Sequence, residues 1–196
     1  MSKKIYQFKI SLKGIRPPIW RRIQVPEDYD FYELHVAIQD AMGWYDSHLH
    51  QYEIMNPKTG EREIIGMPDD EYDDVEIKDE KTTKIARYFK IIKKANYEYD
   101  FGDAWEHEIV LEKVIPAQDG ETYPKCVAGK RACPPEDCGG VWGYEELLDI
   151  MQDPKHPEHK ERKEWLGGEF ESEKFDAAEV SFENPKKRLK ELLEYS

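Results

Sequence analysis

The chain has 196 residues, of which 42 are acidic and 29 basic, so its formal net charge at pH 7 is −13. Its length suits a single domain over residues 1–196 that can bury a core, and its 39% hydrophobic and 12% aromatic content excludes a disordered chain. An acidic excess of this size repels the phosphate backbone of nucleic acids, which makes a nucleic-acid partner unfavourable.

The N-terminal residues predict a cytoplasmic protein. Met1-Ser2-Lys3-Lys4 leads directly into an alternating segment, without the apolar block of a signal peptide. No stretch is long and apolar enough to cross a bilayer, so no membrane partner is expected. The three cysteines cannot all pair with one another, and we expect reduced thiols.

Alternating apolar residues predict strands, and the first two are separated by Arg16-Pro17-Pro18, because proline cannot donate a hydrogen bond to a sheet. Asp30 and Glu33 form a capping-box pattern at the start of a helix that Gly43 ends. The expected strands are residues 5–15, 19–25, 48–55, 62–66, 95–101 and 105–115. The expected helices are residues 31–42, 82–89, 144–151 and 157–166, followed by a final helix after Asn184-Pro185.

Two segments show no regular spacing of apolar residues that would predict a helix or a strand. Residues 67–81 contain the predominantly acidic run from Asp69 to Glu80 and are expected to form a surface loop. Residues 116–143 are rich in Pro, Gly and Cys, and we expect an ordered loop that something other than secondary structure must hold.

The order of the elements predicts the fold class. Strands fill the first two-thirds of the chain, and the C-terminal third is expected to be helical. This is the pattern of an α+β protein with a mainly antiparallel sheet and helices packed on one face. A parallel α/β fold would need strands and helices to alternate.

Four segments taken together resemble a known family. They are residues 16–22 (RPPIWRR), 41–50 (AMGWYDSHLH), 99–107 (YDFGDAWEH) and 132–140 (ACPPEDCGG). From about Ile5 to its end the chain resembles the plasmid pRiA4b third-open-reading-frame-like family of bacterial and archaeal proteins. The family is functionally uncharacterised, so the resemblance implies no reaction. A resolvase, as some members are labelled, would need an arginine-rich serine site and a basic recognition helix, and the sequence has neither pattern.

The first candidate site would bind a metal. Cys126, Cys133 and Cys138 lie in the unpatterned loop, where thiolates could bind Zn²⁺ with His107 as the fourth ligand and with His48 and His50 as further candidates. Their spacing is not that of a zinc ribbon or finger, and three packed, reduced thiols explain it as well.

The second candidate is a catalytic set made of His48, His50, Asp103 and His107, which could support metal-dependent hydrolysis if the four residues converge. His48 and His50 are two apart on an expected strand and so share a face. The alternative is structural: His107 shares its strand face with apolar residues, as a core histidine does, and Asp103 belongs to a tight turn.

Three functions therefore stay open. The preferred hypothesis is a non-enzymatic binding or adaptor-like protein, with a protein partner and a structural metal site as further possibilities. The alternative is a metal-dependent hydrolase. A third is a nucleic-acid-binding protein associated with mobile elements, which would use the basic residues of the first two strands.

Overall fold

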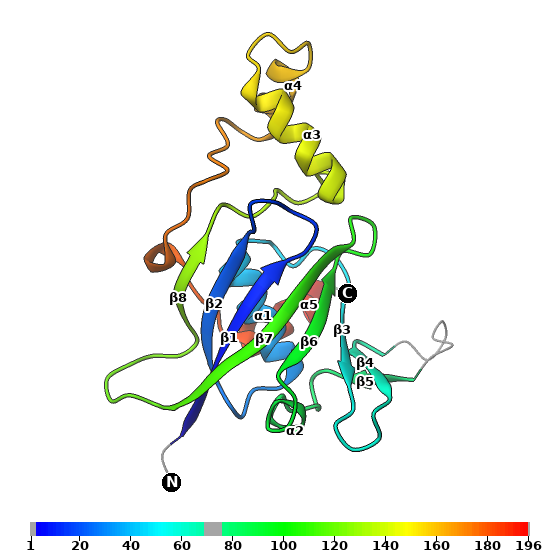
Figure 1. Cartoon of the computed structure of the whole chain (residues 1–196), viewed down its shortest axis with the longest axis vertical. Coiled ribbons are helices and arrows are strands. Elements are labelled where there is room, and N and C mark those ends of the chain that lie inside the picture. The colour runs from blue at the N-terminus through cyan, green and yellow to red at the C-terminus, as the bar shows by residue number, and fades with distance from the viewer. Residues whose placement is uncertain (1–2, 69–75, 196) are drawn as a thin grey trace.

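The computed structural model describes residues 3–68 and 76–195, and its centre is one sheet of eight strands (Figure 1). The strand order is β5-β4-β3-β6-β7-β1-β2-β8, and every adjacent pair is antiparallel except β4 and β5, which are parallel. The expectation of a mainly antiparallel sheet is confirmed. The strands are β1 (Lys4–Leu12), β2 (Trp20–Pro26), β3 (His50–Met55), β4 (Arg62–Gly66), β5 (Ile77–Asp79), β6 (Lys94–Tyr99), β7 (Trp105–Pro116) and β8 (Lys125–Lys130).

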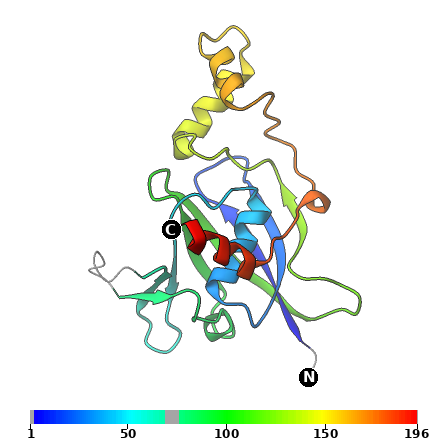
Figure 2. The same ribbon diagram turned by 180° about the vertical axis from the view of Figure 1, so that it is seen from behind.

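The helices do not all lie on one face of the sheet. α1 covers one face, and α5 lies across the outer side of α1 (Figure 2), whereas α3 and α4 pack together and project from one end of the sheet (Figure 1). The expected single helical layer is therefore correct only for α1 and α5. The helices are α1 (Phe31–Met42), α2 (Ala86–Phe89), α3 (Gly140–Gln152), α4 (His159–Trp165) and α5 (Pro185–Tyr195), with a short 3-10 turn at Ala177–Glu179.

α1 begins and ends where the sequence predicts. The side chain of Asp30 accepts a hydrogen bond from the Glu33 N–H at 2.9 Å, and the Glu33 carboxylate accepts one from the Asp30 N–H at 2.9 Å. Gly43 ends the helix with a φ of 94°, which a residue with a side chain rarely adopts. Because α5 covers its outer side, α1 is buried almost all round.

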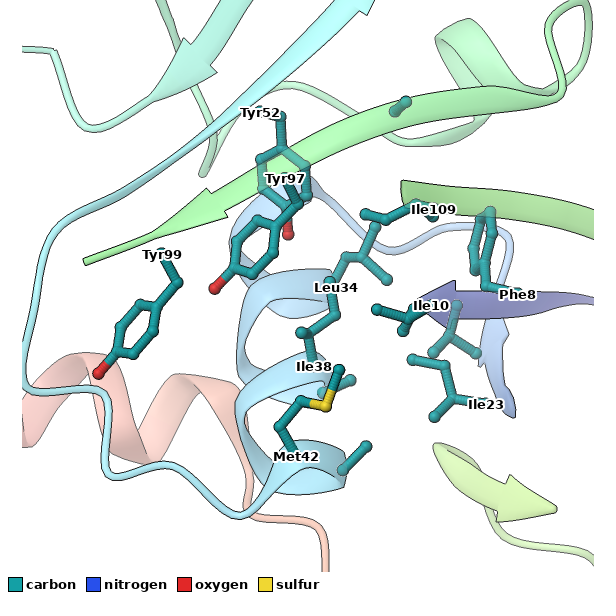
Figure 3. Packing of buried hydrophobic residues seen from close by; sticks show 14 of the residues in the cluster. Phe8, Ile10, Ile23, Leu34, Ile38, Met42, Tyr52, Tyr97, Tyr99 and Ile109 are labelled. Atoms are coloured by element: carbon teal, nitrogen blue, oxygen red, sulfur yellow. The ribbon is translucent and has the colours of Figure 1, made fainter. Parts of the chain in front are cut away.

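The core lies between α1 and the inner face of the sheet. Phe8 and Ile10 of β1 pack against Leu34 and Ile38 of α1 (Figure 3). Towards β3 the core becomes aromatic, and Tyr52, Tyr97 and Tyr99 turn their hydroxyl groups towards α1 and the segment that follows it (Figure 3).

The long irregular loop predicted for residues 116–143 is shorter than expected. β7 continues to Pro116, Lys125–Lys130 forms β8, and α3 begins at Gly140. β8 is the edge strand of the sheet and pairs with β2, a partner distant in sequence. Its short segment contains a glycine and shows no clear alternation of apolar and polar residues. The irregular segment before α3 is therefore residues 131–139, which we call the Pro/Cys/Gly loop.

The acidic segment also differs from the expectation. Residues 69–75 of the predicted loop 67–81 lie outside the described residues, but Ile77–Asp79 forms β5 beside β4. Glu80 is fully buried rather than on the surface. Among the helices in the described part of the chain, none has the length and apolar character needed to cross a membrane.

Candidate functional site

One imidazole and three carboxylates meet at the end of the sheet where the Pro/Cys/Gly loop passes. His48 belongs to the segment between α1 and β3, Asp100 follows β6, and Glu136 and Asp137 lie in the Pro/Cys/Gly loop. We call these four residues the His48 cluster. Three connections that are far apart in sequence thus bring polar side chains to one place.

The distances within the His48 cluster are those of ligands around a shared ion. The Nε2 atom of His48 lies 3.1 Å from Asp137 Oδ1, 3.6 Å from Asp100 Oδ2 and 3.7 Å from Glu136 Oε2. One ligand atom from each of His48, Asp100 and Asp137 lies within 4.8 Å of the others. Neighbouring ligands of a divalent cation with bonds of about 2.1 Å are themselves about 3 Å apart.

One carboxylate oxygen of Asp100 and one of Glu136 are held by hydrogen bonds from neighbouring parts of the chain. Asp100 Oδ1 accepts hydrogen bonds from the N–H groups of Gly102 at 2.9 Å and Asp103 at 3.3 Å. Glu136 Oε1 accepts from the Tyr45 N–H at 2.6 Å and from the Tyr99 hydroxyl at 3.0 Å. Each carboxylate therefore keeps its other oxygen directed towards His48.

The backbone at two of these residues is in the left-handed region. Asp100 has a φ of 57° and Asp137 a φ of 58°, a conformation that glycine adopts freely and that aspartate tolerates at some cost. The two turns also touch, because the Gly139 N–H donates to Asp103 Oδ2 at 3.1 Å. A Cβ atom on Gly140 would come within 2.5 Å of the Asp103 carbonyl oxygen. Close backbone packing therefore sets how the two turns face each other.

The charges of the His48 cluster are not balanced by basic side chains. The Nε2 atom of His48 is buried and, although Asp137 Oδ1 lies 3.1 Å away, it forms no hydrogen bond of good geometry with the described residues. In the described part of the chain, Lys and Arg nitrogens lie more than 4.0 Å from the carboxylates of Asp100, Glu136 and Asp137. Three carboxylates around one imidazole form a strongly negative site, which favours a cation.

A second polar group lies deeper, between α1 and the sheet. The Nε2 atom of His35 lies 2.7 Å from Asp46 Oδ1, and the Nε2 atom of His50 lies 2.6 Å from Glu80 Oε2. The Tyr97 hydroxyl accepts from the Gln39 amide at 3.0 Å, so its own hydrogen points to His35 Nδ1 at 2.8 Å. His35 then carries its proton on Nε2 and donates it to Asp46. We call His35, Asp46, His50 and Glu80 the inner network.

Burial makes His35 a neutral imidazole. Burial, with the nearby His50 adding to the effect, lowers the pKa of His35 to about 4. Its neutral form suits the hydrogen bonds just described, because one ring nitrogen accepts and the other donates.

The inner network also brings ligand-type atoms together, since those of His35, Asp46 and His50 lie within 4.8 Å of one another. The rings of His35 and His50 are parallel within 3°, and their centroids are 3.4 Å apart. An imidazole lone pair lies in the plane of its ring, so one ion cannot lie in the planes of two stacked rings. The inner network is therefore better explained by its hydrogen bonds, and the His48 cluster is the better cation site.

The residues proposed for a zinc site are not brought together. The three cysteines are free, Cys126 is buried in β8, and Cys133 and Cys138 are half-buried in the Pro/Cys/Gly loop. Two groups of at least three His, Cys, Asp or Glu side chains approach closely enough to share an ion within the described ranges, and neither includes a cysteine or His107.

The four residues proposed for hydrolysis lie in separate settings. His48 belongs to its own cluster, and His50 belongs to the inner network. His107 is fully buried beside Trp44, with its Nδ1 atom 3.3 Å from the Tyr97 carbonyl oxygen. Asp103 binds the Gly139 N–H. His107 thus lies in the core, as its strand pattern predicts.

Sequence reasoning missed His35, Asp46 and Glu80 as partners of the histidines. It considered Asp100 as part of an acidic turn with Asp103, Glu106 and Glu108 that could support hydrolysis beside His107, but not as a partner of His48, and it quoted Glu136 and Asp137 only within a motif. The sequence did offer one indication of these residues, because Asp100, Glu136 and Asp137 lie in two of the segments that carry the family resemblance.

The basic residues of the first two strands do not form a basic face. Arg22 forms an ion pair with Glu112 at 2.6 Å, and Lys13 forms one with Glu106 at 3.3 Å, so β7 supplies acidic partners on the same face. This pairing leaves little support for binding of a phosphate backbone.

Comparison with known proteins establishes the family. The model of the plasmid pRiA4b ORF-3-like proteins matches residues 4–179. The chain belongs to this family. The matched residues include the whole His48 cluster and the inner network, while α5 lies beyond them.

Two similar proteins carry no assigned activity. The uncharacterised protein y4hQ of Sinorhizobium fredii is 34% identical over 194 residues, covering 98% of this chain and 94% of the relative. The crystal structure of MM3350, a protein of unknown function from Methanosarcina mazei Go1, is similar with a TM-score of 0.86 and 50% identity. That similarity covers 93% of this chain and 100% of the solved chain. The family therefore supplies the fold, and the function has to be argued from the site.

Proposed function

We propose that this protein binds one divalent cation at the His48 cluster and that the bound cation holds the Pro/Cys/Gly loop against the end of the sheet. The protein is then a cation-dependent binding protein, in which the ion completes one wall of a groove. The observation that carries this proposal is the buried Nε2 atom of His48, which faces carboxylate oxygens of Asp100, Glu136 and Asp137 within 3.7 Å and forms a hydrogen bond with none of them.

The ligand types favour a transition metal. Carboxylate oxygens alone suit Mg²⁺ or Ca²⁺, whereas an imidazole nitrogen favours ions such as Mn²⁺ and Zn²⁺. Three or four protein ligands leave coordination positions open on a six-coordinate ion such as Mn²⁺. We expect Mn²⁺ or Zn²⁺ to bind more tightly than Mg²⁺ at equal concentration.

A cation explains how the Pro/Cys/Gly loop is held. The loop already contacts the segment between α1 and β3 through the Trp44 indole N–H, which donates to the Pro134 carbonyl oxygen at 3.0 Å. The ion would add a bond from Asp137 to His48 and Asp100. The metal clamp considered for this loop is then formed by carboxylates and one imidazole, and the cysteines take no part in it.

Titration calorimetry with MnCl₂ and ZnCl₂ on chelator-treated protein tests the proposal. We expect one equivalent to bind, and we expect His48→Ala, Asp100→Asn and Asp137→Asn each to weaken binding by more than about tenfold. Asp28→Asn and His159→Ala, at positions away from the cluster, are the matched controls and should bind as the unchanged protein does. Absence of binding, or binding that survives His48→Ala, would contradict the proposal.

Metal-dependent hydrolysis is a second candidate function, and the open coordination positions of the ion favour it, because a bound water can be activated there. Its residues would be those of the His48 cluster, with Tyr99 orienting Glu136. Hydrolysis of neutral p-nitrophenyl esters by Mn²⁺-loaded protein, compared with the His48→Ala variant, tests this. Equal rates for both proteins would exclude it.

A further inference from the structure

A groove lies beside the His48 cluster. Its volume is about 520 Å³, and it runs between the segment after α1, the Pro/Cys/Gly loop and the end of α4. Glu136 and Asp137 belong both to the groove and to the cluster. A molecule in the groove can therefore reach a cation bound at the cluster.

Exposed aromatic side chains line this groove. Tyr45 is 84% exposed and Trp165 is 46% exposed, although both are large rings that globular proteins usually cover. The backbone of Tyr45 is held by Glu136, so its ring is presented from a fixed position. The two rings offer flat apolar surfaces to a ligand.

The charges of the groove restrict the ligand. Glu136 and Asp137 are the charged residues among those that line it in the described chain, and the lining includes no Lys or Arg. One divalent cation on the carboxylates of Asp100, Glu136 and Asp137 leaves a formal charge of −1. Phosphates, sulfates and carboxylates are therefore poor ligands, and neutral oxygens are better suited to the open positions of the ion.

We propose that the groove binds carbohydrate, with two adjacent hydroxyl groups on the cation and the apolar face of a sugar ring stacked on Tyr45 or Trp165. This inference rests on the proposed cation site. A pyranose combines a flat C–H face with neighbouring neutral oxygens that can chelate one ion. A peptide offers its carbonyl oxygens singly, which matches the open coordination positions less well.

The test uses the full chain, loaded with Mn²⁺ or treated with chelator, on a printed panel of mono- and oligosaccharides, with a proline-rich peptide as the competing ligand. The best-bound oligosaccharide is then titrated in solution. We expect binding only in the Mn²⁺-loaded protein. Tyr45→Ala and Trp165→Ala should each weaken sugar binding about 3- to 10-fold while Mn²⁺ still binds.

Trp142→Ala is the matched control, because Trp142 is 83% exposed but does not line the groove. It should leave sugar binding unchanged. The inference is overturned if the Mn²⁺-loaded protein binds no sugar on the panel, if it binds only the peptide, or if both groove variants bind sugar normally. Failure of Mn²⁺ itself to bind would instead overturn the proposed function, so the two failures can be told apart.

Discussion

The imidazole rings of His35 and His50 lie face to face, with centroids 3.4 Å apart and planes within 3° of parallel. Each ring is hydrogen-bonded to its own carboxylate: His35 to Asp46, and His50 to Glu80. This pair joins α1 to β3 and so fixes both ends of the segment that carries His48. The inner network therefore supports the His48 cluster without contacting a ligand.

Loss of His50 should destabilise the protein strongly. The Glu80 carboxylate is fully buried, and its other oxygen has no hydrogen-bond partner among the described residues. His50→Ala leaves this group without its partner, and we expect the free energy of unfolding to fall by about 3–5 kcal/mol in urea denaturation. Adding Glu80→Gln should restore part of the loss. Additive effects of the two substitutions would show that they are not coupled.

Stability should fall between pH 6.5 and 4 because two histidines are buried in neutral form. Burial lowers the pKa of both His35 and His107 from 6.5 to about 4. In this range the unfolded chain binds protons at both residues and the folded protein does not, so acid favours unfolding. Each histidine contributes up to about 1.4 kcal/mol per pH unit.

Urea denaturation across this pH range, for the unchanged protein and for His107→Gln, measures that contribution. The variant loses one of the two titrating groups, so its free energy of unfolding should depend less steeply on pH. Equal slopes for the two proteins would mean that His107 is not neutral in the folded state.

Arg188 should fix α5 to the rest of the protein. Its guanidinium lies 2.6 Å from Asp40 and 3.8 Å from Asp46, and its side chain is only 14% exposed. Arg188→Met leaves two largely buried carboxylates without this cation, and we expect a loss of about 2–4 kcal/mol in the free energy of unfolding. Limited proteolysis should then cut before α5. Lys187→Met, at an exposed neighbouring position, should change stability by less than about 0.5 kcal/mol.

Thiol reactivity should separate the two metal sites, because Cys126 lies in β8, outside the loop that the proposed cation holds, whereas Cys133 and Cys138 lie within it. Burial raises the pKa of Cys133 well above its ordinary value and that of Cys138 to about 12, so both thiols should react slowly with Ellman's reagent. We expect Cys133 and Cys138 to react more slowly with Mn²⁺ than with chelator, because the cation holds their loop, and Cys126 to react at the same rate in both. Protection of Cys126 as well, by Mn²⁺ or Zn²⁺, would instead support the three-cysteine site suggested by the sequence.

Local patterns predicted local structure well. Asp30, Glu33 and Gly43 mark the ends of α1 correctly, because capping depends on residues only a few positions apart. β8 was missed because its pairing with β2 is set by a partner about a hundred residues away. Glu80 was assigned to a solvated acidic run, whereas its burial depends on His50, which reaches it from another strand.

The candidate site was also missed because it depends on contacts between residues far apart in the sequence. His48 and Asp137 were both visible in the sequence within segments that carry the family resemblance. Their meeting depends on the contact between the turn after β6 and the Pro/Cys/Gly loop, which places Gly140 against the Asp103 carbonyl. No spacing along the chain encodes that contact.

Positions 100 and 137 must meet two different requirements, one set by the left-handed backbone of the turn and one by the proposed cation. The turns alone can be formed by glycine or asparagine, which also adopt positive φ, whereas a cation requires a carboxylate. Relatives that carry glycine at both positions would therefore keep the fold and lose the ion. If the proposed cation binds, the residues at these two positions would divide the pRiA4b ORF-3-like family into members that bind it and members that retain only the scaffold.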